Sequence, residues 1–252
     1  GLADAAPVKT PMTVSDDKRA VHPEDKMMEK PKEYQAAVGA LMYLATQTRP
    51  DIAYATGKLA RVMIMPTERH WKMAMRIIKY LGSTRTLGPT YAPDGDDEIV
   101  GYCDADYAGC ANTRRSTSGM CFMRAGAFVS ARSNIQKSTA ASTCEAEYMS
   151  LLGGTKQALW WRRALIDLEE EVTVPTVLFE DNQGALAMTK DKLVNERSKH
   201  IQVAYHFTQE QVEQKTIRVE YKPTDEMLAD LMTKALPEER HVRLTRMIMG
   251  LK

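Results

Sequence analysis

The chain has 252 residues, of which 44% are hydrophobic, so it can form one large or two small domains with a packed core. Its formal net charge of +1 excludes the overall basic character typical of many nucleic-acid-binding domains, although a local basic groove is compatible with this value. The four cysteines form no CxxC pair, and neither a signal peptide nor an apolar run near 18 residues is present. We therefore expect an intracellular protein with reduced thiols and no membrane span.

The first 90 residues fall into two segments that differ in composition and in the spacing of their apolar residues. Residues 1–31 are polar and rich in Pro, Lys and Asp, which predicts an extended or poorly ordered lead-in. Apolar residues then recur at helical spacing through residues 32–90 and predict a compact unit of three helices. The third of these helices is expected to begin after Thr67 as its N-cap and to stop at Gly82.

The remainder of the chain alternates strand and helix patterns and predicts an α/β domain over residues 98–236. Strand candidates are residues 99–103, 119–124, 127–132, 176–180 and 216–221. Helix candidates are residues 144–168, 182–189, 201–213 and 225–235, with a further C-terminal helix in residues 237–252. Three consecutive strands indicate an antiparallel meander, and the later alternation indicates parallel strands joined by crossovers. The expected fold is therefore α/β with a five-stranded mixed sheet, preceded by a small helical unit.

Acidic residues stand at or near the ends of four of these elements: Asp104, Glu147, Asp181 and Asp230. In an open α/β sheet such ends gather into one crevice, where clustered carboxylates repel one another unless cations lie between them. Two Mg²⁺ ions roughly 3.5–4 Å apart can activate a water and stabilise a leaving oxygen in phosphodiester cleavage. The four acids together predict this chemistry, although each of them alone is better explained as a turn or first-turn residue.

The helix predicted around Glu147 supports this interpretation. Leu151, Gly154 and Ala158 follow Glu147 at spacings of four, three and four residues and therefore share its face. Small residues on that face allow the helix to approach the sheet closely, which would direct Glu147 toward the strand ends.

Several short motifs in this region resemble one family. The strings DADYAG, RRSTSG, EAEY, EDNQGAL, RSKHI and LADLMTK resemble the ribonuclease H region of the Pol polyproteins of copia-type long-terminal-repeat retrotransposons. Upstream, VGALMYLATQTRPDIAYATGKLAR and the HW of the next helix resemble the end of the reverse transcriptase of the same family. The resemblance covers nearly the whole chain, and the motifs occur in the family's order.

This resemblance implies a ribonuclease H-like fold and an endonuclease that degrades the RNA strand of RNA–DNA hybrids during reverse transcription. It implies two Mg²⁺ ions (or Mn²⁺) and four metal-binding catalytic acids: Asp104, Glu147, Asp181 and Asp230. Asp106 and Glu145 are the near alternatives to the first and second of these acids. The helical unit, residues 32–90, would be a remnant of the reverse transcriptase thumb and connection. The implied partners are an RNA–DNA hybrid and the rest of the Pol polyprotein, in a cytoplasmic virus-like particle or the nucleus.

Other polar residues near these motifs are candidates for contacts with the hybrid. Each has an ordinary alternative, helix capping for the asparagine and solvent exposure for the others. The candidates are Arg115, Asn182, Gln183, Arg197, Lys199 and His200.

The chain also departs from related nucleases. No histidine stands in the loop at residues 221–226, where cellular and retroviral ribonucleases H often have one, and no YxDD polymerase signature is present. The chain is therefore not expected to synthesise DNA alone. Two rival interpretations are a catalytically inactive nucleic-acid-binding remnant and, with less support, a transposase or integrase core, which needs only three acids.

Overall fold

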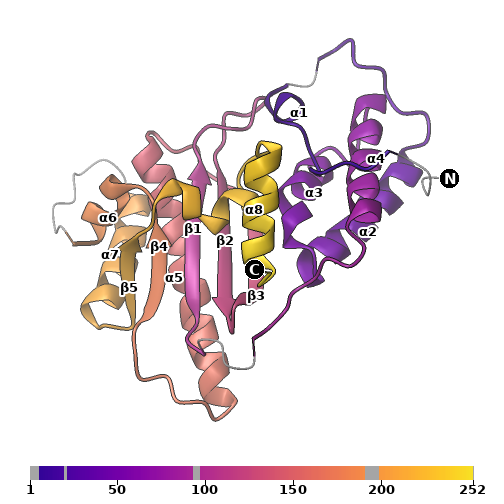
Figure 1. Cartoon of the computed structure of the whole chain (residues 1–252). Helices are drawn as coiled ribbons and strands as arrows, with labels where there is room; N and C mark the ends of the chain where they lie inside the picture. The colour runs from indigo at the N-terminus through magenta and orange to yellow at the C-terminus, as the bar shows by residue number, and fades with distance from the viewer. Residues whose placement is uncertain (1–5, 20–21, 93–96, 191–198, 252) are drawn as a thin grey trace.

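A computed structural model of the chain describes residues 6–19, 22–92, 97–190 and 199–251, and side chains in all of these except residues 199–205. Its centre is a single five-stranded sheet with the order β3-β2-β1-β4-β5 (Figure 1). The first three strands pair antiparallel, and β4 and β5 run parallel to β1. This topology confirms the predicted α/β ribonuclease H-like fold. The strands are β1 Val100–Asp106, β2 Thr117–Arg124, β3 Ala127–Ile135, β4 Thr176–Glu180 and β5 Ile217–Tyr221.

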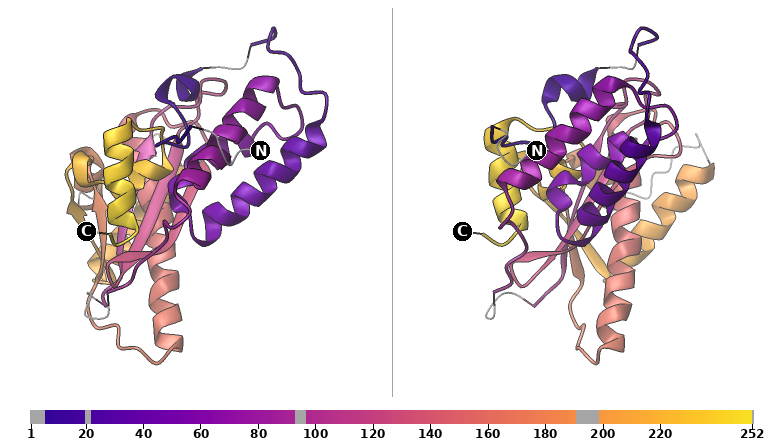
Figure 2. Two further views of the ribbon diagram at one scale, coloured as in Figure 1. Left: turned by 45° about the vertical axis from the view of Figure 1, so that its right-hand side comes forward. Right: turned by 90° about the vertical axis from the view of Figure 1, so that its right-hand side faces the viewer.

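Helices cover both faces of this sheet (Figures 1 and 2). One face packs against the long helix α5, Thr143–Asp167, through a core that contains Cys103, Leu151 and Leu178. The other face packs through Cys121 against Met232 of the 3₁₀ helix η3, Leu228–Met232, and against the C-terminal helix α8, Glu238–Ile248. The remaining elements of this half are α6 Gln183–Lys190, α7 Lys199–Glu213, η2 Thr224–Glu226, η3 Leu228–Met232 and α8 Glu238–Ile248. No helix among the described residues combines the length and apolarity needed to cross a membrane.

The α-helix predicted for residues 225–235 is wrong. The segment forms two 3₁₀ helices, η2 and η3, separated by Met227 in an extended conformation (φ −75°, ψ 98°). Met227 is fully buried, and all five residues of η3 are buried as well. A regular helix would expose part of this apolar run, whereas the 3₁₀ geometry lays the whole of it against the sheet.

The helical unit forms as expected beside the β3 edge of the sheet (Figure 2). Its own core contains Tyr34, Val38, Leu59 and Ile77, all fully buried. Thr67 caps the last of its helices by accepting a hydrogen bond from the backbone N–H of His70. That helix continues through Gly82 and ends one residue later, so the predicted stop is corrected. The elements are α2 Pro31–Gln47, η1 Pro50–Ile52, α3 Ala53–Ala60 and α4 Glu68–Ser83.

Part of the lead-in is ordered, contrary to the expectation for residues 1–31. It contains a short helix, α1 Val14–Lys18, and Met12 joins the core of the helical unit. Asp17 forms an ion pair with Lys58 and accepts hydrogen bonds from the Tyr54 hydroxyl at 2.5 Å and the Ala235 backbone N–H at 3.1 Å. These partners explain the difference, because a buried carboxylate with three donors fixes the chain around it.

Gly119 on β2 allows η3 to lie directly on the sheet. A Cβ at this position would come within 2.6 Å of Thr233 Cγ2, 2.7 Å of Met232 Cβ and 2.8 Å of the Ala229 carbonyl oxygen. Two of these atoms belong to or adjoin the backbone, so they cannot move away cheaply.

We therefore expect Gly119→Ala to lower the free energy of unfolding by about 1–3 kcal/mol through overpacking. Gly39→Ala is the matched control, because a Cβ at Gly39 on α2 meets nothing within 4 Å. In that exposed helix interior alanine should raise stability by about 0.5–1 kcal/mol. Urea unfolding of both variants checks the pair. Equal effects of the two changes would contradict the close packing of η3.

Candidate active site and metal centre

Asp104 lies inside β1, two residues before the strand ends, rather than just after it as the sequence predicted. It pairs with Gly119 in the antiparallel register, and the residue is only 2% exposed. One carboxylate oxygen, Oδ2, accepts a hydrogen bond from the Thr233 hydroxyl. The Ser150 hydroxyl donates to the Asp104 carbonyl oxygen at 2.8 Å, which ties α5 to this point of the strand.

Glu147 projects from the beginning of α5, whose N-cap is Ser142. The close approach of this helix depends on Gly154, where a Cβ would stand 2.2 Å from Cys103 Sγ on β1. Leu151, Gly154 and Ala158 are all buried, so the predicted inward face of the helix is confirmed. The result is a glutamate that is 4% exposed at the sheet.

Three of the predicted acids converge. Asp104, Glu147 and Asp181 each place a carboxylate oxygen within 4.8 Å of the others. Glu147 Oε2 is buried and has no hydrogen-bond partner, so this carboxylate keeps a strong acceptor unsatisfied. Asp181 follows β4 and accepts a hydrogen bond from the Thr224 hydroxyl at 2.6 Å. Three oxygen ligands with an orphaned acceptor fit a hard divalent cation such as Mg²⁺.

Glu145 and Asp106, the alternatives to Glu147 and Asp104 as metal ligands, are not members of this cluster. Glu145 accepts a hydrogen bond from the Ala141 backbone N–H at 2.8 Å and so serves the N-terminus of α5. Asp106, at the end of β1, is only partly buried, and Gly109 makes room for it, because a Cβ there would meet its carboxylate. The geometry therefore favours Glu147 over Glu145 and Asp104 over Asp106.

Asp230, the fourth predicted acid, lies beside the cluster but is held by cations. It is fully buried on η3, and its Oδ1 atom is 2.6 Å from Lys234 Nζ. Its Oδ2 atom forms an ion pair with Arg240 from α8. Lys234 Nζ also lies 3.7 Å from Asp104 Oδ2, so this lysine joins the two aspartates.

Burial dominates the electrostatics of the cluster. It raises the pKa of the Asp104 carboxyl, which Lys234 counteracts and Asp230 reinforces. Burial, followed by the charges of Asp104 and Glu180, also raises the pKa of Glu147. For Lys234, burial works against the ammonium, but Asp104 and Asp230 more than offset it and raise its pKa. Without a metal ion, therefore, Asp104 and Glu147 retain protons at a pH where ordinary carboxyls have lost them.

The metal-free protein should consequently lose stability as the pH rises. The unfolded chain releases these protons near pH 4, whereas folded Asp104 and Glu147 keep them, so each pH unit above 4 costs up to about 1.4 kcal/mol per group until the folded pKa is reached. A divalent cation removes this cost, because it stabilises the ionised carboxylates. Urea unfolding in EDTA and in Mg²⁺ should show a difference that grows from pH 5 to pH 8. A difference independent of pH would contradict the shifted carboxyls.

A further buried acid, which the sequence motifs did not single out, acts on this cluster. Glu180, the last residue of β4, is fully buried, and burial holds its pKa well above the ordinary value. Its Oε1 accepts a hydrogen bond from the Asn182 backbone N–H at 3.1 Å, while Oε2 has no partner. Strand alternation was the available signal, because it places Glu180 on the same face as Leu178, which packs toward α5.

The structure describes the side chains of three of the six predicted nucleic-acid contacts, Arg115, Asn182 and Gln183. Asn182 Oδ1 accepts a hydrogen bond from the Ala185 backbone N–H at 3.0 Å, so it caps α6, as the ordinary alternative predicted. Gln183 and Arg115 are exposed. Lys199 and His200 begin α7, with side chains outside the described set, and Arg197 lies outside the described residues.

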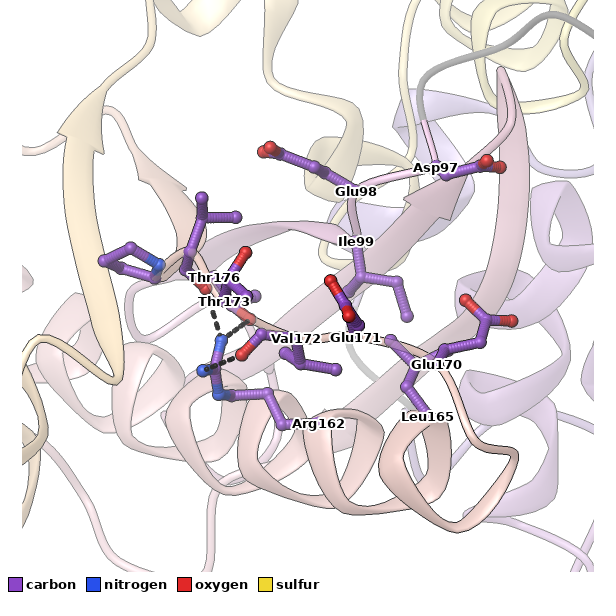
Figure 3. A pocket seen from close by; sticks show the side chains of 12 residues that line it. Asp97, Glu98, Ile99, Arg162, Leu165, Glu170, Glu171, Val172, Thr173 and Thr176 are labelled. Carbon is purple, nitrogen blue, oxygen red and sulfur yellow. Dashed lines mark hydrogen bonds between the residues drawn. The ribbon is translucent and has the colours of Figure 1, made fainter.

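A separate pocket of about 220 Å³ lies at the opposite end of the sheet, beside the start of β4 (Figure 3). Asp97, Glu98, Glu170 and Glu171 give it an acidic rim. Arg162 inside it donates to the carbonyl oxygens of the neighbouring loop, at 2.6 Å to that of Val174. Its guanidinium therefore holds the loop in place, and the pocket takes no part in the acid cluster.

Comparisons with known proteins place the chain among transposon sequences. It matches no family model. It is 35% identical over 247 residues to the retrovirus-related Pol polyprotein from transposon TNT 1-94 of Nicotiana tabacum, covering 95% of this chain. It is 37% identical over 235 residues to that from transposon RE1 of Arabidopsis thaliana, covering 93%. The chain spans only 18% and 16% of the length of these two polyproteins.

Two further matches cover about half of the chain. A secreted RxLR effector protein, number 161 of Plasmopara viticola, is 46% identical over 127 residues, which are 50% of this chain and 89% of that protein. Among solved structures, LC11-RNase H1 isolated from compost aligns at 14% identity with a TM-score of 0.42, over 54% of this chain and 93% of that one. The strand order, and not this low-scoring alignment, establishes the fold.

Proposed function

Because the chain belongs to the family of retrovirus-related Pol polyproteins of copia-type retrotransposons, we propose that residues 98–236 are its ribonuclease H domain. The proposed reaction is metal-dependent hydrolysis of the RNA strand of an RNA–DNA hybrid during reverse transcription. The single observation that carries it is the convergence of Asp104, Glu147 and Asp181 within 4.8 Å on a ribonuclease H-like sheet.

Each acid has a defined part in this proposal. Asp104, Glu147 and Asp181 hold the divalent cation, Mg²⁺ or Mn²⁺, through oxygens that β1, α5 and the end of β4 bring together. The bound cation supplies activation of a water molecule and stabilisation of charge on the leaving oxygen. Asp230 orients the site from η3, where Lys234 and Arg240 hold its carboxylate. The two-ion form predicted from the sequence needs Asp230 as a ligand as well and stays a prediction.

The family also leads us to propose the adjoining domain, the partners and the cellular location of the chain. The helical unit, residues 32–90, is proposed to be the end of the reverse transcriptase, thumb and connection, with the C-terminal helix in residues 237–252 packing on the nuclease. The proposed partners are an RNA–DNA hybrid and the rest of the polyprotein. The proposed location is inside the cell, in a virus-like particle or the nucleus. Arg115, Gln183, Arg197, Lys199 and His200 remain proposed contacts to the hybrid.

The rival function is a nucleic-acid-binding remnant without activity. The buried acids argue against it, because uncompensated carboxylates such as Glu147 cost stability and a chain without metal chemistry gains nothing from keeping them. A transposase or integrase core has less support, since it needs only three acids and lacks the EAEY and LADLMTK strings.

Strand-specific cleavage tests the proposal. The purified chain, with Mg²⁺, is given an RNA–DNA hybrid labelled on either strand, an RNA duplex and a DNA duplex of the same sequence. We expect cuts in the RNA of the hybrid alone. Cleavage of DNA would favour the transposase or integrase alternative, and binding of the hybrid without cleavage would favour the inactive remnant.

A further inference from the structure

The side of the cluster where Asp104 meets Asp230 already contains a cation. Lys234 Nζ lies 2.6 Å from Asp230 Oδ1 and 3.7 Å from Asp104 Oδ2, between the two carboxylates. A lysine ammonium is charged at neutral pH, and its compact charge occupies the kind of position that a metal ion takes between two acids.

Both neighbours of this lysine along the chain are fixed. The Thr233 hydroxyl donates to Asp104 Oδ2, and the Ala235 backbone N–H donates to Asp17 Oδ2 at 3.1 Å. Lys234 is therefore held at the cluster by tertiary contacts on either side. Arg240 forms an ion pair with the other oxygen of Asp230, so each oxygen of that carboxylate already has a side-chain cation beside it.

The charges of the cluster agree with one bound ion. Asp104, Glu147, Glu180, Asp181 and Asp230 carry five negative charges when ionised, and Lys234 with Arg240 supplies two positive ones. One divalent cation leaves a single negative charge. Two divalent cations in addition to both side-chain cations would leave the cluster with excess positive charge before any substrate arrives.

We infer that Lys234 takes the place of a second divalent cation, so that the substrate-free site binds one ion, through Asp104, Glu147 and Asp181. This inference rests on the proposed metal-dependent function and refines it. Lys234 is a positioning residue that holds Asp104 and Asp230 together. Removing its charge opens a second cation site between these two carboxylates.

The test counts bound Mn²⁺ per chain by electron paramagnetic resonance of the free ion, with the full chain and no nucleic acid. We expect one Mn²⁺ in the wild type and two in Lys234→Met. Lys234→Arg, which keeps the positive charge, should bind one. Lys156→Met is the matched control, because Lys156 is exposed and lies over the ring of Phe207 on α7, and this variant should also bind one.

Each outcome decides the inference. Two Mn²⁺ ions bound to the wild type would overturn the inference, whatever the variants bind. The wild-type count therefore tests the inference even if thermal unfolding shows that Lys234→Met does not fold. One ion in a folded Lys234→Met would overturn it as well. A wild type that binds no Mn²⁺ would overturn the proposed metal centre itself, whereas a wild type that binds two and cleaves hybrid RNA would overturn only this inference.

Discussion

Replacing Asp104 by asparagine is expected to abolish cleavage of the RNA strand while leaving the protein folded. The carboxylate is 2% exposed and belongs to the group of three acids whose oxygens lie within 4.8 Å. Losing several kcal/mol of metal-mediated charge stabilisation corresponds to a rate loss of about 10³-fold or more. Single-turnover cleavage of a labelled hybrid at saturating Mg²⁺ measures the effect.

The control for this variant is Asp167→Asn, which removes an exposed carboxylate at the other end of α5. Its cleavage rate should equal that of the wild type. Asp104→Asn should keep or raise the free energy of unfolding in EDTA at pH 8, because it removes a buried carboxyl with a raised pKa. Full hydrolysis by Asp104→Asn would remove this aspartate from the catalytic site.

The second large effect concerns stability and the helical unit. Asp51 on η1 is paired with Arg49, and the two side chains are 0% and 7% exposed. Arg49 donates two hydrogen bonds to this carboxylate, at 3.0 and 2.8 Å, and the Tyr80 hydroxyl donates a third at 2.7 Å. Asp51→Ala leaves the guanidinium buried without its counter-charge, which should cost about 3–5 kcal/mol of unfolding free energy.

Two comparisons sharpen this prediction in urea unfolding. Glu220→Gln breaks the ion pair with Arg218, whose partners are 55% and 44% exposed, and should cost under about 1 kcal/mol. The double variant Arg49→Met, Asp51→Ala should lose less than Asp51→Ala alone, because no unpaired charge remains. Equal losses in Asp51→Ala and Glu220→Gln would contradict the buried role of this pair.

Asp51, the acid of the buried ion pair, also links the helical unit to the sheet domain. His241 on α8 approaches the Asp51 carbonyl oxygen at 3.3 Å, so the helical unit and the C-terminal helix share a buried contact. We therefore expect Asp51→Ala to lower the stability of the sheet domain as well as that of the helices.

The five strands and the mixed character of the sheet followed from the sequence because short apolar runs are separated by turn-rich segments. Residues 176–180 are a case in point, since the predicted and observed strands coincide. The convergence of Asp104, Glu147 and Asp181 was also predictable, because acids at strand and helix ends of an α/β sheet meet at one edge.

Features set by distant contacts were not predictable. The helical pattern of residues 225–235 gave no sign of the extended Met227, whose conformation depends on burial against the sheet. The order in the lead-in depends on Asp17 meeting Lys58 and Ala235, more than 40 and 200 residues away. Lys234 stands four residues after Asp230, a spacing visible in the sequence, but its reach to Asp104 and the arrival of Arg240 from α8 exist only in the folded chain.

The most direct test of the central claim, that this acid cluster performs metal-dependent RNA cleavage, is restoration of activity by metal. The chain is stripped with EDTA and mixed with an RNA–DNA hybrid labelled on the RNA, and Mg²⁺ is then added in excess. The account predicts intact RNA in EDTA and cleaved RNA once Mg²⁺ is present. Cleavage that persists in EDTA, or intact RNA at saturating Mg²⁺ with the hybrid bound, would contradict it.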